Sequence, residues 1–207
     1  MHPLKVNKIY YIIAIFGIIL LGSCKQQNSF DSEEALWAYL KKEDNGYLQT
    51  KIVNGVTYRL LYKPTDLLVK QELKPTDERT QIDNLRRKYD KYCYFSLSMS
   101  KANQELLNSM AGNRQKFGAM VNQLAFGMQE KIHLFNQKRD TIPLLDYIYP
   151  RMYGMSKSTS ILLVYPRDEL KDATELNITI KDLGFGTGEV KLTQQMNEII
   201  NQPRLKL

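Results

Sequence analysis

The strongest local signal for the fold is the stretch Tyr47-Leu48-Gln49-Thr50-Lys51-Ile52-Val53-Asn54-Gly55-Val56-Thr57-Tyr58-Arg59-Leu60-Leu61-Tyr62. It places an Asn-Gly pair between two runs of β-prone residues. Both residues of such a pair accept a positive φ, which a tight primed turn requires. The pattern therefore predicts a β-hairpin in which Val53 lies opposite Val56 and Tyr47 lies opposite Tyr62.

Helices are expected on both sides of this hairpin. Asp31 and Glu34 have the spacing of an acidic helix cap and its partner, which predicts a short helix that ends by Asn45-Gly46. Residues 64–91 are charged and helical in pattern, with a break at Lys74-Pro75, and residues 102–128 are helical with an interruption around 111–113. The last of these helices carries an apolar stripe that is expected to face the core, formed by Phe117, Met120, Val121, Leu124 and Met128.

The C-terminal third is expected to be mostly β. Apolar residues and serines alternate along residues 92–100, and short strands with turn residues between them are expected at 131–137, 141–149, 160–165, 176–181 and 189–194. These elements predict a single α+β domain over residues 31–207. Its N-terminal helices and hairpin are followed by a C-terminal antiparallel sheet or small sandwich.

The first 24 residues indicate where the protein works. Lys5 and Lys8 precede an apolar run of 13 residues (9–21), which is shorter than the roughly 20 residues of a membrane-spanning helix. A basic start and a short apolar region are typical of a secretory signal. At the end of this run Leu21-Gly22-Ser23-Cys24 resembles the lipobox of bacterial lipoprotein precursors. An uncleaved anchor helix with an incidental cysteine is the alternative interpretation.

The resemblance implies that residues 1–23 are removed and that the thiol of Cys24 receives a diacylglycerol. Two or more acyl chains hold a protein stably on a membrane. We therefore expect a lipid-anchored protein of the cell envelope, joined to its anchor by a short polar tether that extends to Phe30. The outer membrane is the expected place, since Lys25 is not the aspartate that retains some lipoproteins at the inner membrane. Which face of the membrane it occupies stays open.

The layout is also similar to that of small lipoproteins of Bacteroidetes-type bacteria. Its parts are the lipobox, a short tether, an early Asn-Gly hairpin and a β-rich end that closes on Leu205-Lys206-Leu207. These lipoproteins share no activity or catalytic residues that the resemblance could transfer to this chain.

The charge of the chain bears on its partners. The full sequence has a formal net charge of +7, and without residues 1–23, which contain two lysines and no acidic residue, +5 remains. An exported, lipid-anchored protein seldom meets nucleic acid, so nucleic acid is not an expected partner. Anionic lipid headgroups, an acidic envelope polymer or an envelope protein fit the location better. An ordinary solvated surface explains the same charge.

The sequence contains no complete catalytic or metal-binding motif. His133 is the only histidine after Cys24, so a zinc site built from several histidines or cysteines is not expected within one subunit. Cys93 is expected to be a small buried hydrophobic residue rather than a nucleophile. Ser98 and Lys101 match the Ser-x-x-Lys motif of penicillin-binding proteins, but that motif lies on a helix and Ser98 is expected in a strand. The glycine-rich residues 184–188 are expected to form a turn or bulge rather than a phosphate loop. No catalytic residue, metal ligand or cofactor is predicted.

One segment stands out as a candidate partner-binding surface. Tyrosine and arginine are enriched at interface hot spots, and methionine adapts to irregular partners. The segment gathers Tyr147, Tyr149, Arg151, Met152 and Tyr153 next to a turn at Pro150. Packing of a strand end against the core is the other explanation for the same residues.

The sequence thus favours a lipid-anchored envelope protein that acts as a non-catalytic binding or structural module. Two alternatives remain open. An envelope hydrolase would require a cleft that gathers carboxylates with Ser98 or tyrosines. A carrier of lipid or a small ligand would require an apolar cavity in the β-rich half.

Overall fold

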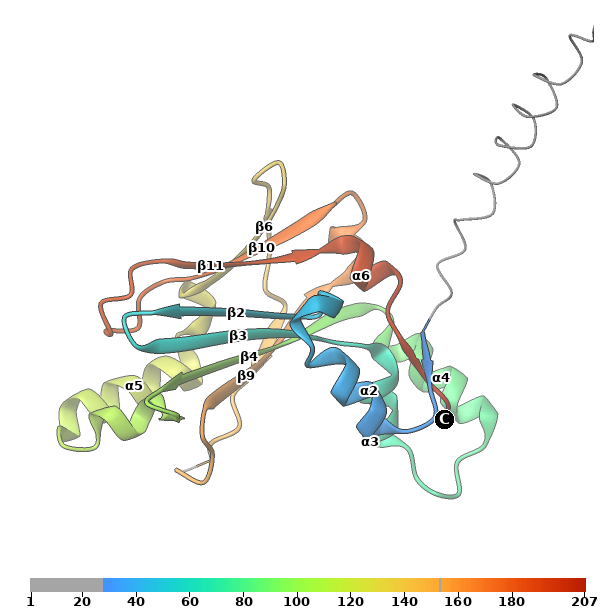
Figure 1. Cartoon of the computed structure of the whole chain (residues 1–207), viewed down its shortest axis with the longest axis horizontal. Helices are drawn as coiled ribbons and strands as arrows, with labels where there is room; N and C mark the ends of the chain where they lie inside the picture. Colours follow the sequence, from blue (N-terminus) through green and yellow to red (C-terminus); the bar gives the residue numbers. More distant parts are fainter. Residues whose placement is uncertain (1–27, 153) are drawn as a thin grey trace, which may run out of the picture.

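The predicted hairpin lies in the larger of two antiparallel sheets (Figure 1). The structure is a computed structural model that describes residues 28–152 and 154–207. In it β2 (Leu48–Val53) pairs with β3 (Val56–Lys63), and Val53 lies opposite Val56. Tyr62 donates its backbone N–H to the carbonyl of Tyr47 over 3.0 Å, and their rings stack at a centroid distance of 6.4 Å. The predicted register is confirmed.

The larger sheet has the strand order β2-β3-β4-β9-β8. It includes β4 (Tyr92–Lys101), β8 (Asp146–Ile148) and β9 (Thr159–Pro166), and the short β5 (Gln104–Glu105) pairs with the end of β4. Alternate side chains of its three central strands face the core and are buried. They are Val56, Tyr58, Leu60, Tyr62, Cys93, Phe95, Leu97, Met99, Ile161, Leu163 and Tyr165.

The smaller sheet has the order β11-β10-β6-β7 and shares one core with the larger sheet. Its strands are β6 (Ile132–Asn136), β7 (Thr141–Ile142), β10 (Glu175–Ile180) and β11 (Val190–Gln195). The edge strand β11 runs beside β2 (Figure 1). Gln194 donates to the carbonyl of Gly46 over 2.8 Å, and Asn54 donates to that of Phe185 over 2.6 Å. These contacts join the β2–β3 hairpin of the larger sheet to β11 of the smaller sheet and to the loop before it.

The strand expected at residues 141–149 is in fact two strands in different sheets. β7 pairs with β6 in the smaller sheet, whereas β8 pairs with β9 in the larger one. Pro143 directly follows β7, and proline has no N–H to donate to a strand partner. The chain therefore leaves one sheet at Pro143 and enters the other three residues later.

The cap of the first helix, α2 (Glu33–Leu40), lies one residue later than expected. Ser32, not Asp31, caps it, and its hydroxyl accepts the backbone N–H of Ala35 over 3.2 Å. Asp31 instead forms an ion pair with Lys206 at 2.5 Å. The helix ends at Leu40, and the 3-10 turn η1 (Glu43–Asn45) continues the chain to Gly46.

The charged region after the hairpin is helical, as predicted, with a break between α3 (Thr65–Glu72) and α4 (Arg79–Tyr89). Residues 102–128 are less helical than expected. They contain β5, the 3-10 turn η2 (Leu106–Met110), α5 (Arg114–Phe126) and the start of the 3-10 turn η3 (Met128–Glu130). Two short helical elements lie in the C-terminal third, namely the 3-10 turn η4 (Arg167–Leu170) before β10 and α6 (Met196–Ile200) after β11.

The two described ends of the chain are paired with each other. β1 (Ser29–Phe30) pairs in parallel with β12 (Arg204–Leu205). Ser29 and Phe30, the last residues of the expected tether, thus form a strand, and Phe30 packs against the core. Cys24 and the expected signal peptide lie outside the described residues.

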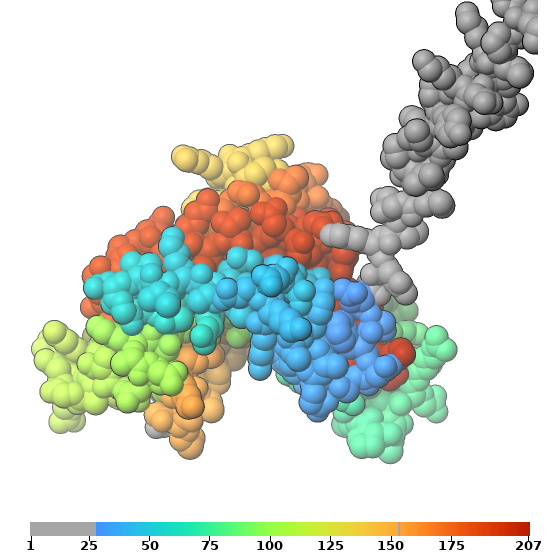
Figure 2. All heavy atoms as spheres, viewed as in Figure 1, coloured from blue at the N-terminus to red at the C-terminus, as the bar shows by residue number. Residues whose placement is uncertain are grey.

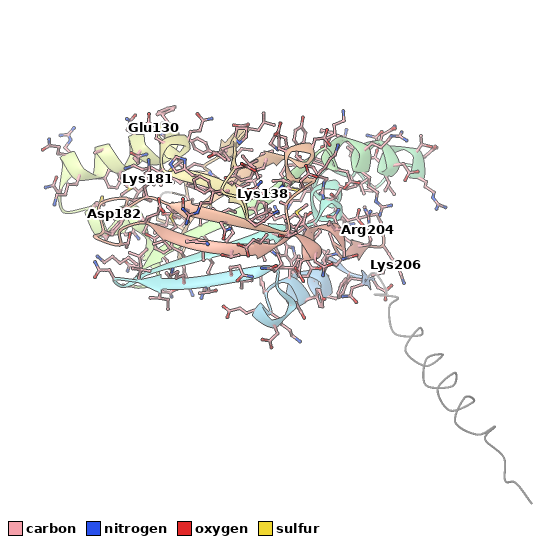
Figure 3. All side chains as sticks on the ribbon, turned by 90° about the horizontal axis from the view of Figure 1, so that it is seen from above. Glu130, Lys138, Lys181, Asp182, Arg204 and Lys206 are labelled. Atoms are coloured by element: carbon pink, nitrogen blue, oxygen red, sulfur yellow. The ribbon has the colours of Figure 1, made fainter. Side chains whose placement is uncertain are left out.

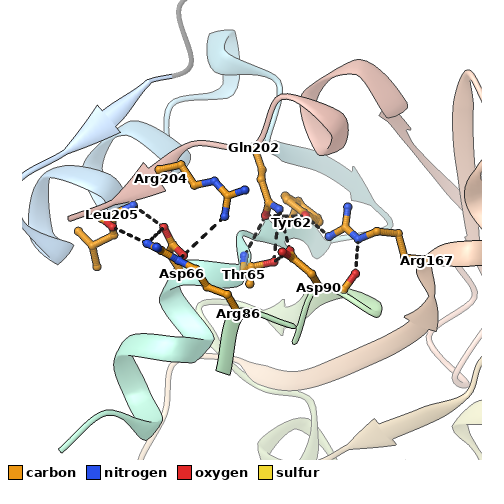
Figure 4. A network of polar contacts seen from close by, with 9 residues as sticks. All are labelled: Tyr62, Thr65, Asp66, Arg86, Asp90, Arg167, Gln202, Arg204 and Leu205. Carbon is orange, nitrogen blue, oxygen red and sulfur yellow. Dashed lines mark hydrogen bonds and ion pairs between the residues drawn. The ribbon is translucent and has the colours of Figure 1, made fainter. Parts of the chain in front are cut away.

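A buried carboxylate links this strand pair to the helices (Figure 4). The side chain of Asp66, in α3, is 0% exposed. It accepts hydrogen bonds from Arg86 of α4 at 2.7 and 3.1 Å and from the backbone N–H of Leu205 at 2.9 Å. The guanidinium of Arg204 lies 3.8 Å away. One carboxylate thus connects α3, α4 and β12.

A second buried polar group supports the same region (Figure 4). The side-chain carbonyl of Gln202 accepts the hydroxyl of Tyr62 at 3.0 Å and the backbone N–H of Thr65 at 2.9 Å. Arg167 also donates to the hydroxyl of Tyr62, at 3.2 Å, and to the backbone carbonyl of Asp90, at 2.8 Å. The segment before β12 is therefore fixed to the larger sheet and to α3.

The turn of the hairpin requires a positive φ at Gly55, and this requirement can be tested. Its φ is +74°, and a Cβ added there would contact no other atom, so a substitution acts through the backbone conformation alone. We expect Gly55→Ala to lower the free energy of unfolding by about 1–2 kcal/mol, since the left-handed conformation costs an L-residue that much.

Gly118 of α5 provides the matched control, because a Cβ there also meets open space. Alanine favours a helix interior by up to about 1 kcal/mol over glycine, so Gly118→Ala should leave stability unchanged or raise it. Urea unfolding of both variants measures this. Equal effects of the two substitutions would contradict the primed turn.

Candidate functional site

Four of the five candidate partner-binding residues lie in β8 and in the segment that follows it. The fifth, Tyr153, lies outside the described residues. Tyr147, in β8, and Tyr149, just after it, are half-buried and pack against the core. The backbone N–H of Met128 donates to the hydroxyl of Tyr147 over 3.5 Å. Arg151 and Met152 are exposed. Core packing therefore accounts for the two tyrosines, as the alternative interpretation held, while the two residues after Pro150 face the surface.

A pocket opens beside this segment. Its volume is about 300 Å³, which is at the small end of the range for ligand sites, about 300–1,000 Å³. Its walls come from the turn after β4, from α5 and from the segment after β8. The lining residues are Glu105, Leu107, Asn108, Phe117, Val121, Tyr149, Arg151 and Gly154. The surface inside is mostly apolar, with charged groups contributed by Glu105 and Arg151.

Glu105 shapes the pocket by holding one of its walls. Its side chain belongs to a residue that is 2% exposed. One carboxylate oxygen accepts the backbone N–H of Gly154 and the other accepts that of Ser156, each at 3.1 Å. A carboxylate that receives backbone N–H groups makes strong, charge-assisted hydrogen bonds. Glu105 therefore positions the segment after Met152 and has little capacity left for a ligand.

Arg151 is the charged group in the lining that remains available. It is exposed and makes no hydrogen bond or ion pair with the residues that the structure describes. Phe117 lines the same pocket, and three residues close to Arg151 in the sequence, Ile148, Met152 and Met155, are exposed apolar side chains. Figure 2 shows the segment around residue 155, in orange, next to the green residues of β5 and η2 at the same end of the molecule. The pocket is mostly apolar, and the arginine at its rim has no ion pair in the part of the chain that the structure describes. Such a site suits an apolar ligand group with a negative charge beside it.

Comparison with known proteins adds no assignment to this geometry. The chain matches no protein-family model, and searches of curated proteins and of solved structures found no match. The candidate site therefore rests on the residues of this chain alone.

Six of the eight lining residues of this pocket were not predicted as site residues, and three of them, Phe117, Glu105 and Asn108, show why. Phe117 was expected to face the core with the rest of its stripe, but it is 39% exposed and lines the pocket, whereas Met120, Leu124 and Met128 are buried as expected. Glu105 and Asn108 lie where a helix was expected and a strand and a 3-10 turn are found. A signal for Glu105 was present, since a lone acidic residue interrupts a mostly uncharged stretch from 102 to 113.

Ser98 lies in a strand, β4, as expected, and lines a different cleft of about 570 Å³ together with Lys41, Glu43 and Arg59. This is a grouping of serine and carboxylate that the hydrolase alternative requires. A serine nucleophile also needs a base within hydrogen-bond reach. Among the described residues, none forms a hydrogen bond with the hydroxyl of Ser98.

The glycine-rich loop is occupied by the protein's own carboxylate. Asp182 accepts the backbone N–H groups of Gly184 at 3.1 Å, Phe185 at 2.9 Å and Gly186 at 3.0 Å. Partial desolvation acts to raise the pKa of Asp182, but the backbone hydrogen bonds outweigh it and lower that pKa. Because the amides already converge on an internal anion, the loop is a turn, as predicted, and not a phosphate site.

Cys93 is fully buried in β4, as expected, and burial raises the pKa of its thiol to about 11. His133, the histidine with which a thiol could in principle form a dyad, lies in β6 of the other sheet, and no hydrogen bond joins it to Cys93 among the described residues. Within residues 28–152 and 154–207 the structure groups no three histidine, cysteine or carboxylate side chains that could hold a metal ion. In the same residues, every helix is too short or too polar to cross a membrane.

Proposed function

We propose that this protein is a lipid-anchored binding module of the cell envelope that holds a partner protein at the pocket between α5 and Arg151. The observation that carries the proposal is the pocket itself, with mostly apolar walls, a wall held by Glu105, and at its rim an arginine that has no ion pair with any described residue. The lipobox-like Leu21-Gly22-Ser23-Cys24 supports the anchor and, with it, an outer-membrane location.

The pocket chemistry favours a segment of a partner protein as the occupant. A volume of about 300 Å³ suits one or two apolar side chains better than a whole lipid, whose carrier would need a larger cavity. Arg151 would pair with an acidic residue next to these side chains, since an arginine fork binds a carboxylate through two parallel hydrogen bonds. The exposed apolar side chains close to Arg151 in the sequence would extend the contact, as they do around interface hot spots.

The anchor can be tested with the two cysteines of the chain. In natively expressed protein we expect the first residue to be Cys24 and its mass to include acyl chains. Cys24→Ala should abolish incorporation of labelled palmitate. Cys93→Ala should leave it intact, because the thiol of Cys93 is buried in β4. Mass spectrometry of the purified products reads out both variants.

Two results would contradict the anchor. One is a natively expressed chain that keeps its initial methionine and a free thiol at Cys24. The other is equal labelling of the wild type and the Cys24→Ala variant.

The pocket can be tested by photocrosslinking of the full-length protein in intact envelopes. The photoreactive amino acid benzoylphenylalanine replaces Phe117, which lines the pocket, or Phe126, which is 75% exposed on the same helix and not part of the lining. We expect a discrete adduct with one envelope protein from position 117 and not from position 126.

Charge reversal then tests the role of Arg151. Truncation of an interface arginine often costs about 2 kcal/mol, or roughly 30-fold in affinity, so Arg151→Glu should remove most of the adduct. Lys157→Glu, an exposed change in the same segment, should leave it. The proposal fails if both helix positions give the same adducts or if Arg151→Glu has no effect. An adduct with lipid instead of protein would favour the carrier alternative.

A further inference from the structure

The largest cavity we describe lies at the other end of the molecule, where the two chain ends pair. Its volume is about 740 Å³, and β1, α4 and β12 provide its walls. Four cationic side chains line it, those of Arg79, Arg86, Arg204 and Lys206, together with the carboxylate of Asp90. Figure 3 shows Arg204 and Lys206 close together at this end, far from Asp182 at the other.

The four cations differ in how firmly they are already paired. Arg86 is committed to the buried Asp66 through two hydrogen bonds. Arg204 is only 36% exposed and lies 3.8 Å from the same carboxylate, too far for a hydrogen bond. Lys206 pairs with Asp31 on the surface, where both side chains are mostly exposed, and such pairs contribute little. Arg79 is exposed and has no hydrogen bond or ion pair with the described residues.

The carboxylate in the lining does not offset this charge fully. Asp90 accepts a hydrogen bond from the hydroxyl of Thr65 at 2.6 Å and one from the side-chain amide of Gln202 at 3.3 Å. Asp90 also acts electrostatically on Arg86, and its single charge can balance only one of the four cations. Arg79 has no ion pair among the described residues, and Arg204 has only a long one, at 3.8 Å from Asp66. The forks of these two arginines match the geometry of phosphate oxygens.

The position of the cavity identifies the source of the phosphate, if Cys24 is acylated as proposed above. Ser29 lines the cavity and follows Cys24 by five residues, which span at most about 18 Å when fully extended. A diacylglycerol on Cys24 would thus hold the cavity within reach of the lipid headgroups. Near an anionic membrane each lysine or arginine contributes about 1 kcal/mol of attraction.

We propose that this cavity binds the phosphate of an anionic phospholipid headgroup through Arg79 and Arg204. The contact would orient the folded domain on the membrane, with β1 and β12 against the headgroups. It rests on the proposed lipid anchor and adds a second, non-covalent attachment to it.

The test titrates the full chain, isolated from the envelope in a nonionic detergent, with three soluble probes. These are dihexanoylphosphatidylglycerol, the zwitterionic dihexanoylphosphatidylcholine and inorganic phosphate. The side-chain Nε–H resonances of the arginines report binding. We expect phosphatidylglycerol to shift the resonances of Arg79 and Arg204 and to bind more tightly than either of the other probes.

Single substitutions assign the binding to the cavity. Arg79→Gln and Arg204→Gln should each weaken phosphatidylglycerol binding about fivefold, the loss expected for one cation. Arg79 is exposed, so Arg79→Gln tests the cavity even if Arg204→Gln disturbs the contacts of Asp66. Arg114→Gln removes the same charge from α5, at the opposite end of the domain (Figure 1), and should leave binding unchanged.

Four outcomes would overturn the proposal. They are equal binding of phosphatidylcholine, equal binding of inorganic phosphate, an equal loss in Arg114→Gln, and wild-type binding by Arg79→Gln. The mass of residue 24 in the same preparation separates this failure from that of the anchor. An acylated chain whose cavity variants bind like the wild type refutes the cavity alone, whereas an unmodified Cys24 refutes the anchor.

Discussion

The carboxylate of Asp66 is the group on which the closure of this fold depends. An ion buried among protein atoms loses its hydration, and only well-placed partners offset that cost. Here the partners come from two distant parts of the chain, the side chain of Arg86 and the backbone of Leu205. Because Leu205 belongs to β12 and β12 pairs with β1, the same carboxylate holds both described ends of the chain on the helices.

This closure gives the molecule two unlike ends. The cationic cavity lies where β1 and β12 meet, and the apolar pocket lies beside α5, toward the far end of the long axis (Figure 1). In the function we propose, the first end faces the membrane to which Cys24 is attached. The second end would then point away from the lipid, where a partner protein can reach Arg151. The separation allows attachment and recognition to act independently.

The sequence predicted the elements that depend on neighbouring residues and missed those that depend on distant ones. The hairpin register follows from Asn54-Gly55, which fixes the turn locally, and the α+β class follows from the alternation and helical spacing of apolar residues. Pro143 is a local sequence signal for the break between β7 and β8, although one continuous strand was expected over residues 141–149. The pairing of β1 with β12 was not visible, since Phe30 is a single apolar residue after a polar stretch and its partner Leu205 lies far along the chain. In the same way Arg151 was identified from composition, whereas the roles of Glu105 and Asp66 arise from contacts with residues far along the chain.

The most direct test of this account compares two cations in the last turn of α4. Arg86→Met would leave the buried carboxylate of Asp66 without its main partner. Lys88→Met would break the pair of Lys88 with Glu72, at 2.7 Å, whose side chains are 56% and 41% exposed, and the surface contact of Lys88 with the ring of Tyr89. Urea unfolding should show a loss of about 3–5 kcal/mol for Arg86→Met and less than about 1 kcal/mol for Lys88→Met. Losses of the same size in both variants would contradict the central place given to Asp66.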